Sequence, residues 1–340
     1  WSAILDGNLT TLITAALMIV LGTGPVKGFG VTLTIGIFTT MFAAVVVSKL
    51  ILEMIIHGGL VKRMPMFSVL QNSNYDFLKY AKPAFIGSWL IIAIGLGAVV
   101  YKGKEVYGID FVGGDTVTLK FAKKVEVGAL RSAAQAAGFA EASPVYQKQL
   151  GANLEVLKVT TNFGQGEKLT QALQKAFPDA QFVYEGTTAI GASVGKEIQL
   201  NALWSSFWAL VLILLYVAFR FEFGYGMGAV VATVHDVLMT IGVFVLFDRQ
   251  FNASMVAAIL LVMGYSINDT IVVFDRIREE LKLNPTGSLR DIVTRSLNLT
   301  LSRTVITGGT TLLTAVVLLL VTGGEVNDIA FTLLVGVLTG

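Results

Sequence analysis

Eight long apolar runs constrain the fold of this chain more than any other feature. A transmembrane helix needs about 20 mostly apolar residues. Only 14% of the 340 residues are charged, whereas soluble domains carry roughly 25%. The sequence therefore predicts a polytopic α-helical membrane protein with about eight transmembrane helices. The runs cover residues 8–22, 29–56, 84–101, 198–219, 226–247, 253–274, 296–321 and 327–340.

The composition argues against several functional classes. The chain has no cysteine, which excludes disulfides and thiolate metal sites. With only two histidines, His57 and His235, a multi-histidine metal site is not expected. No phosphate-binding P-loop, no GxSxG and no HExxH occurs. The net charge of +2 is too small to indicate a nucleic-acid partner. We therefore expect no enzymatic activity and no cofactor.

Residues 102–196, between the third and fourth runs, have a different character. They hold many of the charges and most of the alternating, strand-like pattern. Their order predicts β-α-β-α-β, which suits a small ferredoxin-like α+β domain of about 95 residues. The expected strands are 111–121, 154–160 and 181–185, and the expected helices are 127–137 and 167–177.

Basic residues in the connecting segments predict the orientation. Lysine and arginine concentrate in cytoplasmic loops, and here they concentrate in 57–83, 220–225 and 275–295. The turn 322–326 holds Glu325 and no basic residue. Eight helices alternate through these loops without conflict, so the segment 102–196 is predicted to be extracytoplasmic.

The chain contains an internal repeat. A shift of 300 aligns residues 2–40 with 302–340 without a gap, and it superposes Thr-Thr-Leu-x-Thr-Ala at 10–15 on the same letters at 310–315. Such repeats are common in transporters that alternate access. The first two helices therefore resemble the end of one half of a duplicated transporter, and the remainder resembles nearly all of the second half.

Ionisable residues inside the apolar runs are the candidate functional residues, because they are costly in hydrocarbon. Asp269 lies in the sequence GYSINDT, and Arg303 lies in LSRT. Asp269 precedes Asp275 by six residues and Arg303 follows Arg295 by eight, which places both roughly 9–12 Å inside the cytoplasmic boundary. Their helices are consecutive and antiparallel, so the two side chains can meet.

Two interpretations of these residues remain open. Asp269 is a protonatable carboxylate balanced by Arg303, or the two form a structural ion pair between helices. His235 and Asp236 are equally consistent with a structural and a functional role, and Asp110 is expected to cap a turn. A polar seam on one face of the seventh helix is also predicted. Its members are Thr300, Arg303, Thr307, Thr310 and Thr314.

Several segments resemble the SecD/SecF protein-export family of the resistance-nodulation-division superfamily. GIDFVGG at 108–114, VMGYSINDTIVVFDRIRE at 262–279 and LSRTVITGGTTLLTA at 301–315 resemble the SecF part. WSAILDGNLTTLI at 1–13 and GTGPVKGFGVTLTIGI at 22–37 resemble the last two helices of the SecD part. The resemblance covers nearly the whole chain.

The resemblance implies a division of the chain into five parts. It also implies that an intact protein has four more helices and a larger external domain before Trp1. The parts are the last two SecD-like helices at 1–56, a cytoplasmic linker at 57–83, the first SecF-like helix at 84–101, the extracytoplasmic α+β domain at 102–196, and the remaining SecF-like helices at 197–340.

The same resemblance implies a function. Members of the family are accessory subunits of the Sec protein translocase in the bacterial inner membrane, where proton flow drives preprotein export. The implied partners are the Sec translocon channel, the exported preprotein, the missing SecD-like half and the lipid bilayer. The family's proton pathway falls on Asp269 and Arg303, and Asn268, His235 and Asp236 are candidates to extend it.

Two other functions are considered. A proton-coupled exporter of small molecules or lipids belongs to the same superfamily, but such exporters usually carry larger external domains than the segment 102–196. A non-transporting scaffold, in which the intramembrane charges only pair, is the second alternative. Replacement of Asp269 in a full-length protein distinguishes this scaffold from a proton-driven transporter.

The predicted topology has a direct test. Cysteines placed at Lys123 or Lys168, within the α+β domain, should react with a membrane-impermeant thiol reagent in intact cells, because that domain is predicted to be extracytoplasmic. The chain has no native cysteine to interfere. Labelling that requires cell lysis would place the domain in the cytoplasm instead.

Overall fold

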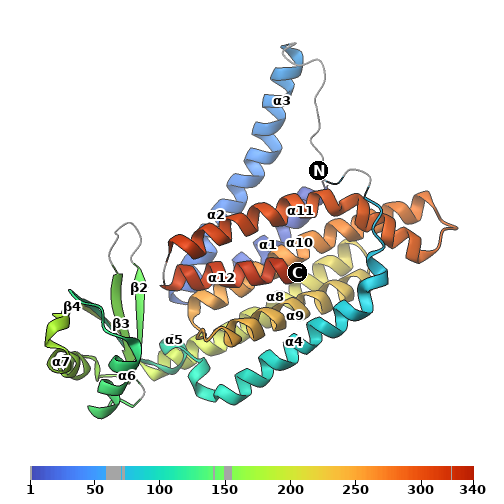
Figure 1. The fold of residues 1–340 in the computed structure, drawn as a ribbon. Helices are drawn as coiled ribbons and strands as arrows, with labels where there is room; N and C mark the ends of the chain where they lie inside the picture. The colour runs from blue at the N-terminus through green and yellow to red at the C-terminus, as the bar shows by residue number, and fades with distance from the viewer. Residues whose placement is uncertain (1, 59–69, 71–72, 141, 149–154, 323) are drawn as a thin grey trace.

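Eight long apolar segments form the helices of a bundle in the computed structural model, which describes residues 2–58, 70, 73–140, 142–148, 155–322 and 324–340 (Figure 1). A small α+β domain lies at one end of the bundle, here called the domain end, and the opposite end is the far end. The predicted fold class is confirmed. The bundle helices are α1 (Ser2–Val20), α2 (Gly24–Phe42), α4 (Ala81–Lys102), α8 (Ala192–Arg220), α9 (Phe223–Leu246), α10 (Ala253–Leu283), α11 (Leu289–Val321) and α12 (Gly324–Thr339), and α3 (Ser48–His57) continues from α2.

Six helical segments of the described chain are long and apolar enough to cross a membrane. One of them combines α2, the π-helical turn η1 (Ala43–Val47) and α3, which extends away from the bundle (Figure 1). The apolar part of α1, Leu5–Val20, falls just below this length. Residues 59–69 and 71–72 of the predicted linker lie outside the described residues, and η2 (Phe77–Tyr80) leads into α4.

The segment 275–295 is largely helical, although it was predicted as a loop. α10 continues to Leu283 and α11 begins at Leu289. Ion pairs between residues three and four apart stabilise the extended end of α10, such as that between Arg276 and Glu280. The Ser288 side chain caps α11 by accepting the Asp291 amide hydrogen. Only a short turn separates the two helices, which fixes them as antiparallel neighbours.

The α+β domain has one more strand than predicted. Its four strands form an antiparallel sheet of order β2-β3-β1-β4, and the β-α-β-β-α-β order is that of a ferredoxin-like domain. The missed strand β2 is a short edge strand that contains Pro144, and pairing with β3 completes it. The elements are β1 (Gly114–Lys120), α6 (Val127–Ala136), β2 (Ser143–Lys148), β3 (Glu155–Thr161), α7 (Gly166–Ala176), η4 (Pro178–Ala180) and β4 (Val183–Ile190).

Both domain helices contribute to the core of the α+β domain. Leu130 of α6 and Leu169 of α7 are fully buried against Leu157 of β3. The first predicted strand, 111–121, begins later than expected, because the 3-10 turn η3 (Gly103–Val106) and the short helix α5 (Ile109–Val112) precede β1. The domain is therefore joined to the bundle by these short helical segments, and residues 103–112 are here called the domain root.

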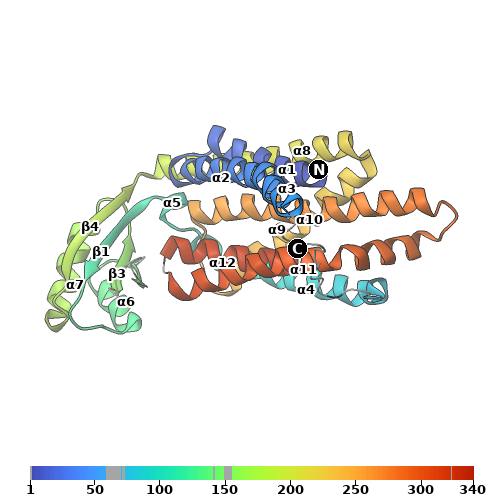
Figure 2. The same ribbon diagram turned by 90° about the horizontal axis from the view of Figure 1, so that it is seen from above.

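Helix α10 is the central helix of the bundle. It packs against α1 on one side and against α11 and α12 on the other (Figure 2). Small residues allow close approach at several crossings, as is common between membrane helices. The tightest involves α4 and α9, where a Cβ atom on Gly95 would lie 2.3 Å from the Cα atom of Gly242.

A valine at Gly95 should destabilise the bundle, because its side chain cannot fit against the α9 backbone. We expect a cost of at least about 1–3 kcal/mol, seen as a lower melting temperature of the detergent-solubilised protein. Gly97→Val is the matched control, since a Cβ atom there meets nothing within 4 Å. Equal melting temperatures for the two variants would contradict the close crossing of α4 and α9.

Candidate functional site

Asp269 and Arg303 lie at the same height on neighbouring antiparallel helices. Asp269 precedes Leu283, where α10 ends, by the same number of positions as Arg303 follows Leu289, where α11 begins. At about 1.5 Å per residue, each is roughly 21 Å from the far end of its helix. The shared height predicted from the sequence therefore also holds when it is counted along the observed helices.

The two side chains are not in direct contact. The field of the Arg303 guanidinium reaches Asp269, but in the described part of the chain neither side chain forms a hydrogen bond or an ion pair within 4 Å. Asp269 is half-buried and Arg303 is exposed. The two opposite charges are thus separated by more than 4 Å in this structure.

The predicted threonine seam does not join the helices through hydrogen bonds. The Thr300 hydroxyl donates to the Ser296 carbonyl of its own helix, and the Thr307 hydroxyl donates to the Arg303 carbonyl. Thr310 and Thr314 also donate within α11. Thr300 is buried, whereas Thr307, Thr310 and Thr314 are exposed together with Arg303. The seam is therefore a self-satisfied polar strip on an uncovered face of α11.

His235 and Asp236 form a second polar cluster with Ser266. Asp236 is buried, at 5% exposure, and one of its oxygens lies 3.0 Å from His235 Nδ1. The Ser266 hydroxyl on α10 donates to the other oxygen at 2.6 Å. The Trp89 ring of α4 lies edge-on to the imidazole, with ring centroids 6.0 Å apart. This cluster connects α9 to α10 one turn before Asp269.

Asn268 faces away from these groups, toward α1. A Cβ atom on Gly7 of α1 would lie 1.9 Å from the Asn268 Oδ1 atom, so the amide fills the space left by the glycine. The site residues predicted from the sequence are therefore distributed over two sides of α10: Asn268 contacts α1, whereas Ser266 connects to α9 and Asp269 lies within the field of Arg303.

An acidic side chain near the start of α1 has partners that the sequence did not predict. Asp6 is 7% exposed and accepts hydrogen bonds from the Tyr216 hydroxyl at 2.7 Å and from Arg220 Nε at 3.1 Å. Tyr216 and Arg220 are one turn apart on α8, so they present both donors on one face. Their spacing is visible in the sequence, but their distant partner near the start of the chain is not.

A polar junction ties the domain root to the bundle at the domain end. The Asp110 carboxylate accepts the Ala253 amide hydrogen at 2.8 Å and so caps α10 rather than its own turn. Asn252, which caps the same helix, donates to Asp328 of α12 at 2.9 Å. Arg249 pairs with Asp328. Backbone hydrogen bonds from Gly108 to Phe251 and from Phe251 to Val106 complete the junction.

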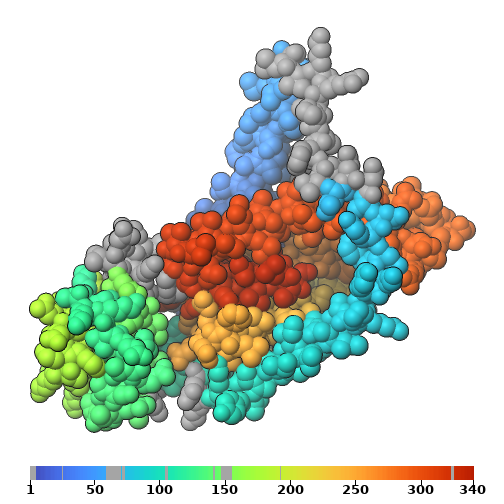
Figure 3. All heavy atoms as spheres, viewed as in Figure 1, coloured from blue at the N-terminus to red at the C-terminus, as the bar shows by residue number. Residues whose placement is uncertain are grey.

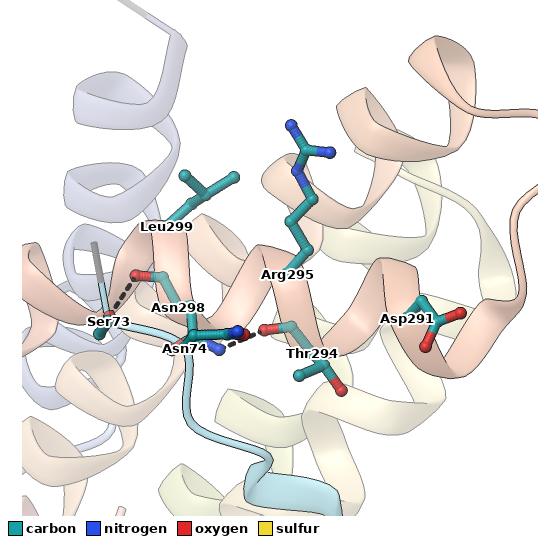
Figure 4. Close-up of a pocket in the computed structure, with 7 residues that line it drawn as sticks. All are labelled: Ser73, Asn74, Asp291, Thr294, Arg295, Asn298 and Leu299. Atoms are coloured by element: carbon teal, nitrogen blue, oxygen red, sulfur yellow. Dashed lines mark hydrogen bonds between the residues drawn. The ribbon is translucent and has the colours of Figure 1, made fainter. Parts of the chain in front are cut away.

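A pocket of about 400 Å³ lies at the far end, between residues 73–74 and the first turns of α11. Asn298 lies beside Ser73 and Asn74, whereas the Arg295 side chain extends away from them (Figure 4). The Asn298 amide exchanges two hydrogen bonds with the Tyr75 backbone, each of 2.9 Å. This contact fastens the segment before α4 to α11. Neither Asp269 nor Arg303 lines the pocket, and the described residues contain no cluster suited to a metal ion.

Comparison with known protein families identifies the second half of the chain. Residues 168–340 match the family model described as protein export membrane protein SecD/SecF, C-terminal. The protein translocase subunit SecDF of Thermus thermophilus is 36% identical over 99% of this chain. The protein translocase subunit SecF of Calditerrivibrio nitroreducens is 38% identical, over 80% of this chain and 91% of that protein.

Solved structures show the same fold. The chain resembles the crystal structure of SecDF, a translocon-associated membrane protein from Thermus thermophilus, with a TM-score of 0.87 and 36% identity over 99% of this chain. SecDF in its super-membrane-facing form matches with a TM-score of 0.75. This chain spans 46% of the length of both SecDF structures and of the Thermus SecDF sequence.

The junction predicts a pH-dependent stability. Burial raises the pKa of the Asp110 carboxyl above its ordinary value. The hydrogen bond from the Ala253 amide lowers this pKa, and the nearby negative charge of Glu325 raises it. The folded protein then binds more protons than the unfolded chain, so the free energy of unfolding falls as pH rises from the ordinary value through the raised one. Asp110→Asn keeps an acceptor for the amide and should flatten this fall, measured as the melting temperature against pH.

Asp248 provides the contrasting variant. The hydrogen bond from Lys102 lowers the pKa of the exposed Asp248 carboxyl, so its contribution is present above the ordinary value and is lost as pH falls. Asp248→Asn should therefore weaken the loss of stability at acid pH and leave the Asp110 effect in place. If the melting temperature of Asp110→Asn depends on pH in the same way as that of the parent protein, Asp110 is not the source of the fall in stability with rising pH.

Proposed function

Because this chain belongs to the SecD/SecF family of protein export membrane proteins, we propose that it is part of an accessory subunit of the Sec protein translocase that uses proton flow to drive preprotein export. One observation carries the proton part of this proposal. Asp269 and Arg303 lie at the same height on neighbouring helices of the bundle, with the field of one reaching the other and no direct ion pair between them. Protons are the coupling ion, and the proposal requires no cofactor.

The charges explain how such a pair responds to a proton. An ionised carboxylate inside a membrane needs a cation within reach, whereas a protonated carboxyl group does not. The Arg303 guanidinium stays ionised throughout. A small movement of α11 against α10 therefore changes the proton affinity of Asp269, and proton binding in turn favours one arrangement of the helices. Proton transfer and helix movement are coupled in this way.

The second polar cluster supports a route for the proton. His235, Asp236 and Ser266 are connected by hydrogen bonds, and Ser266 precedes Asp269 by three residues on α10. Residues three apart lie on neighbouring positions of a helix surface. We assign these three side chains to the path that supplies or removes the proton, whereas Asn268 faces α1 and lies off this path.

The uncovered face of α11 supports a further element of the proposal. α11 forms an exposed ridge on one face of the molecule (Figure 3), and Arg303 is exposed near its middle. An arginine at this depth is costly against hydrocarbon. We propose that the SecD-like half, which the longer SecDF relatives carry in addition to the region matched here, covers this face.

The domain-end junction supports the link from proton to protein export. α10 carries Asp269 in its middle, and its first residues are bonded to the root of the α+β domain through Asp110. We propose that movement of α10 displaces this domain on the extracytoplasmic side of the bacterial inner membrane, where it acts on the preprotein leaving the Sec translocon channel. The lipid bilayer surrounds the bundle in this arrangement.

Replacement of Asp269 by asparagine tests the proposal in the full-length protein. The substitution keeps size and hydrogen bonding but removes the titratable group. Proton-gradient-dependent export into membrane vesicles should be abolished, with little change in the amount of folded protein. Arg303→Met should have the same effect, because the carboxylate then loses its cation.

Asp275→Asn is the control for a general effect of removing an acid from α10. Asp275 pairs with Arg278 at the far end of the same helix, so its loss should leave export and proton flux close to those of the parent protein. If both activities persist in Asp269→Asn at normal expression, the scaffold interpretation holds and proton coupling through Asp269 is wrong.

A further inference from the structure

Helices α1 and α10 fit together through two complementary contacts. The Asn268 side chain of α10 lies in the space left by Gly7 of α1, where a Cβ atom would be 1.9 Å from Oδ1 and 2.8 Å from Cγ. One turn along both helices the roles are exchanged. Thr11 of α1 lies against Gly264 of α10, where a Cβ atom would be 3.1 Å from the Thr11 Cγ2 and Oγ1 atoms. The rotation of α10 about its axis is therefore matched to the position of α1.

The position of α1 is itself fixed by the residue before Gly7. The Asp6 carboxylate is held by Tyr216 and Arg220 of α8. The Arg220 guanidinium lies over the Phe221 ring, 5.5 Å from its centroid, and the Arg278 guanidinium of α10 lies 5.1 Å from the same centroid. Sliding or rotation of α1 against α8 would therefore break the Asp6 contacts with Tyr216 and Arg220.

Asn268 and Asp269 point to different neighbours, as consecutive residues on a helix do at 3.6 residues per turn. The Asn268 amide contacts α1, whereas Asp269 lies within the field of Arg303 on α11. A rotation of α10 that withdraws Asn268 from Gly7 changes the direction of the Asp269 carboxyl group relative to Arg303. The contact with α1 is therefore also a control on the environment of Asp269.

We propose that Asn268 is a positioning residue for Asp269: it fits the notch at Gly7 and thereby sets the orientation of the Asp269 carboxyl group according to the position of α1. α1 belongs to the SecD-like part, so a change in the position of that part would alter the orientation of the Asp269 carboxyl group through this contact. Only this link to the SecD-like part rests on the proposed function, because the effect of Asn268 on Asp269 does not require that export uses the proton.

Gly7→Ala in the full-length protein is the most specific probe. The methyl group collides with the end of a flexible side chain rather than with backbone, so the protein should fold with the Asn268 amide displaced. The readout is the pH at which dicyclohexylcarbodiimide, which modifies protonated carboxyl groups, labels half of Asp269, with Asp269→Asn subtracted as background. We expect the midpoint to move by about half a pH unit or more, roughly a threefold change in the protonation equilibrium.

Gly36→Ala of α2 is the control for an added methyl group, since a Cβ atom there meets nothing within 4 Å. It should leave the labelling midpoint unchanged. Asn268→Ala creates no collision and should move the midpoint as Gly7→Ala does, and the double variant should show no further movement. This variant decides the question if Gly7→Ala fails to fold.

Two results would overturn the proposal: a parental midpoint in folded Asn268→Ala, or a double variant that restores the parental midpoint, which would show that the contact matters only for packing. Failure of the proposed function has a different signature. If Asp269→Asn exports normally while Gly7→Ala and Asn268→Ala still move the midpoint, proton coupling is wrong and the positioning role of Asn268 stands.

Discussion

The cost of leaving a polar group unsatisfied within a membrane governs the arrangement around α10. Neighbouring helices provide partners for polar side chains along its length. Ser254 donates to Glu325 of α12 at the domain end, Ser266 donates to Asp236 of α9 in the middle, and Glu280 pairs with Arg295 of α11 at the far end. Asp269 has no such bonded partner among the described residues.

The internal repeat explains why α10 is held on two sides. α1 and α2 correspond to α11 and α12 under the shift of 300, and the observed helix boundaries agree, with turns after Val20 and after Val321. One repeat unit contacts α10 at Gly264 through Thr11, and the other contacts it where Gly336 of α12 lies against Val262. Both contacts use a glycine to bring helix axes close. Asn268 and Asp269 thus lie on the helix that both related helix pairs contact.

The sequence predicted the helices well and the contacts poorly, for physical reasons. Apolar runs of about 20 residues have few structural solutions in a membrane, so each of the eight predicted runs is helical, and six helical segments of the described chain are long and apolar enough to cross a membrane. The extension of α10 to Leu283 was missed because its last turns depend on ion pairs, and β2 was missed because only pairing with β3 makes a strand of it. The common height of Asp269 and Arg303 followed from counting along the chain. The partners of Asp6 and Asn268 lie far from them in the sequence, and only the fold brings them together.

The continuous helix α10 connects the contacts around Asp269 to the domain end of the bundle. Its 31 residues form one continuous helix of about 46 Å, capped at the domain end by Asp110 and Asn252 and stiffened at the far end by ion pairs. A rigid helix converts a rotation at its middle into the same rotation at its end. The Asp110 cap and the backbone bonds between Phe251 and the segment before the α+β domain join this end of α10 directly to that domain. The residue proposed to bind the proton and the domain proposed to act on the preprotein therefore lie on one continuous connection, and our proposal for Asn268 links that connection to α1.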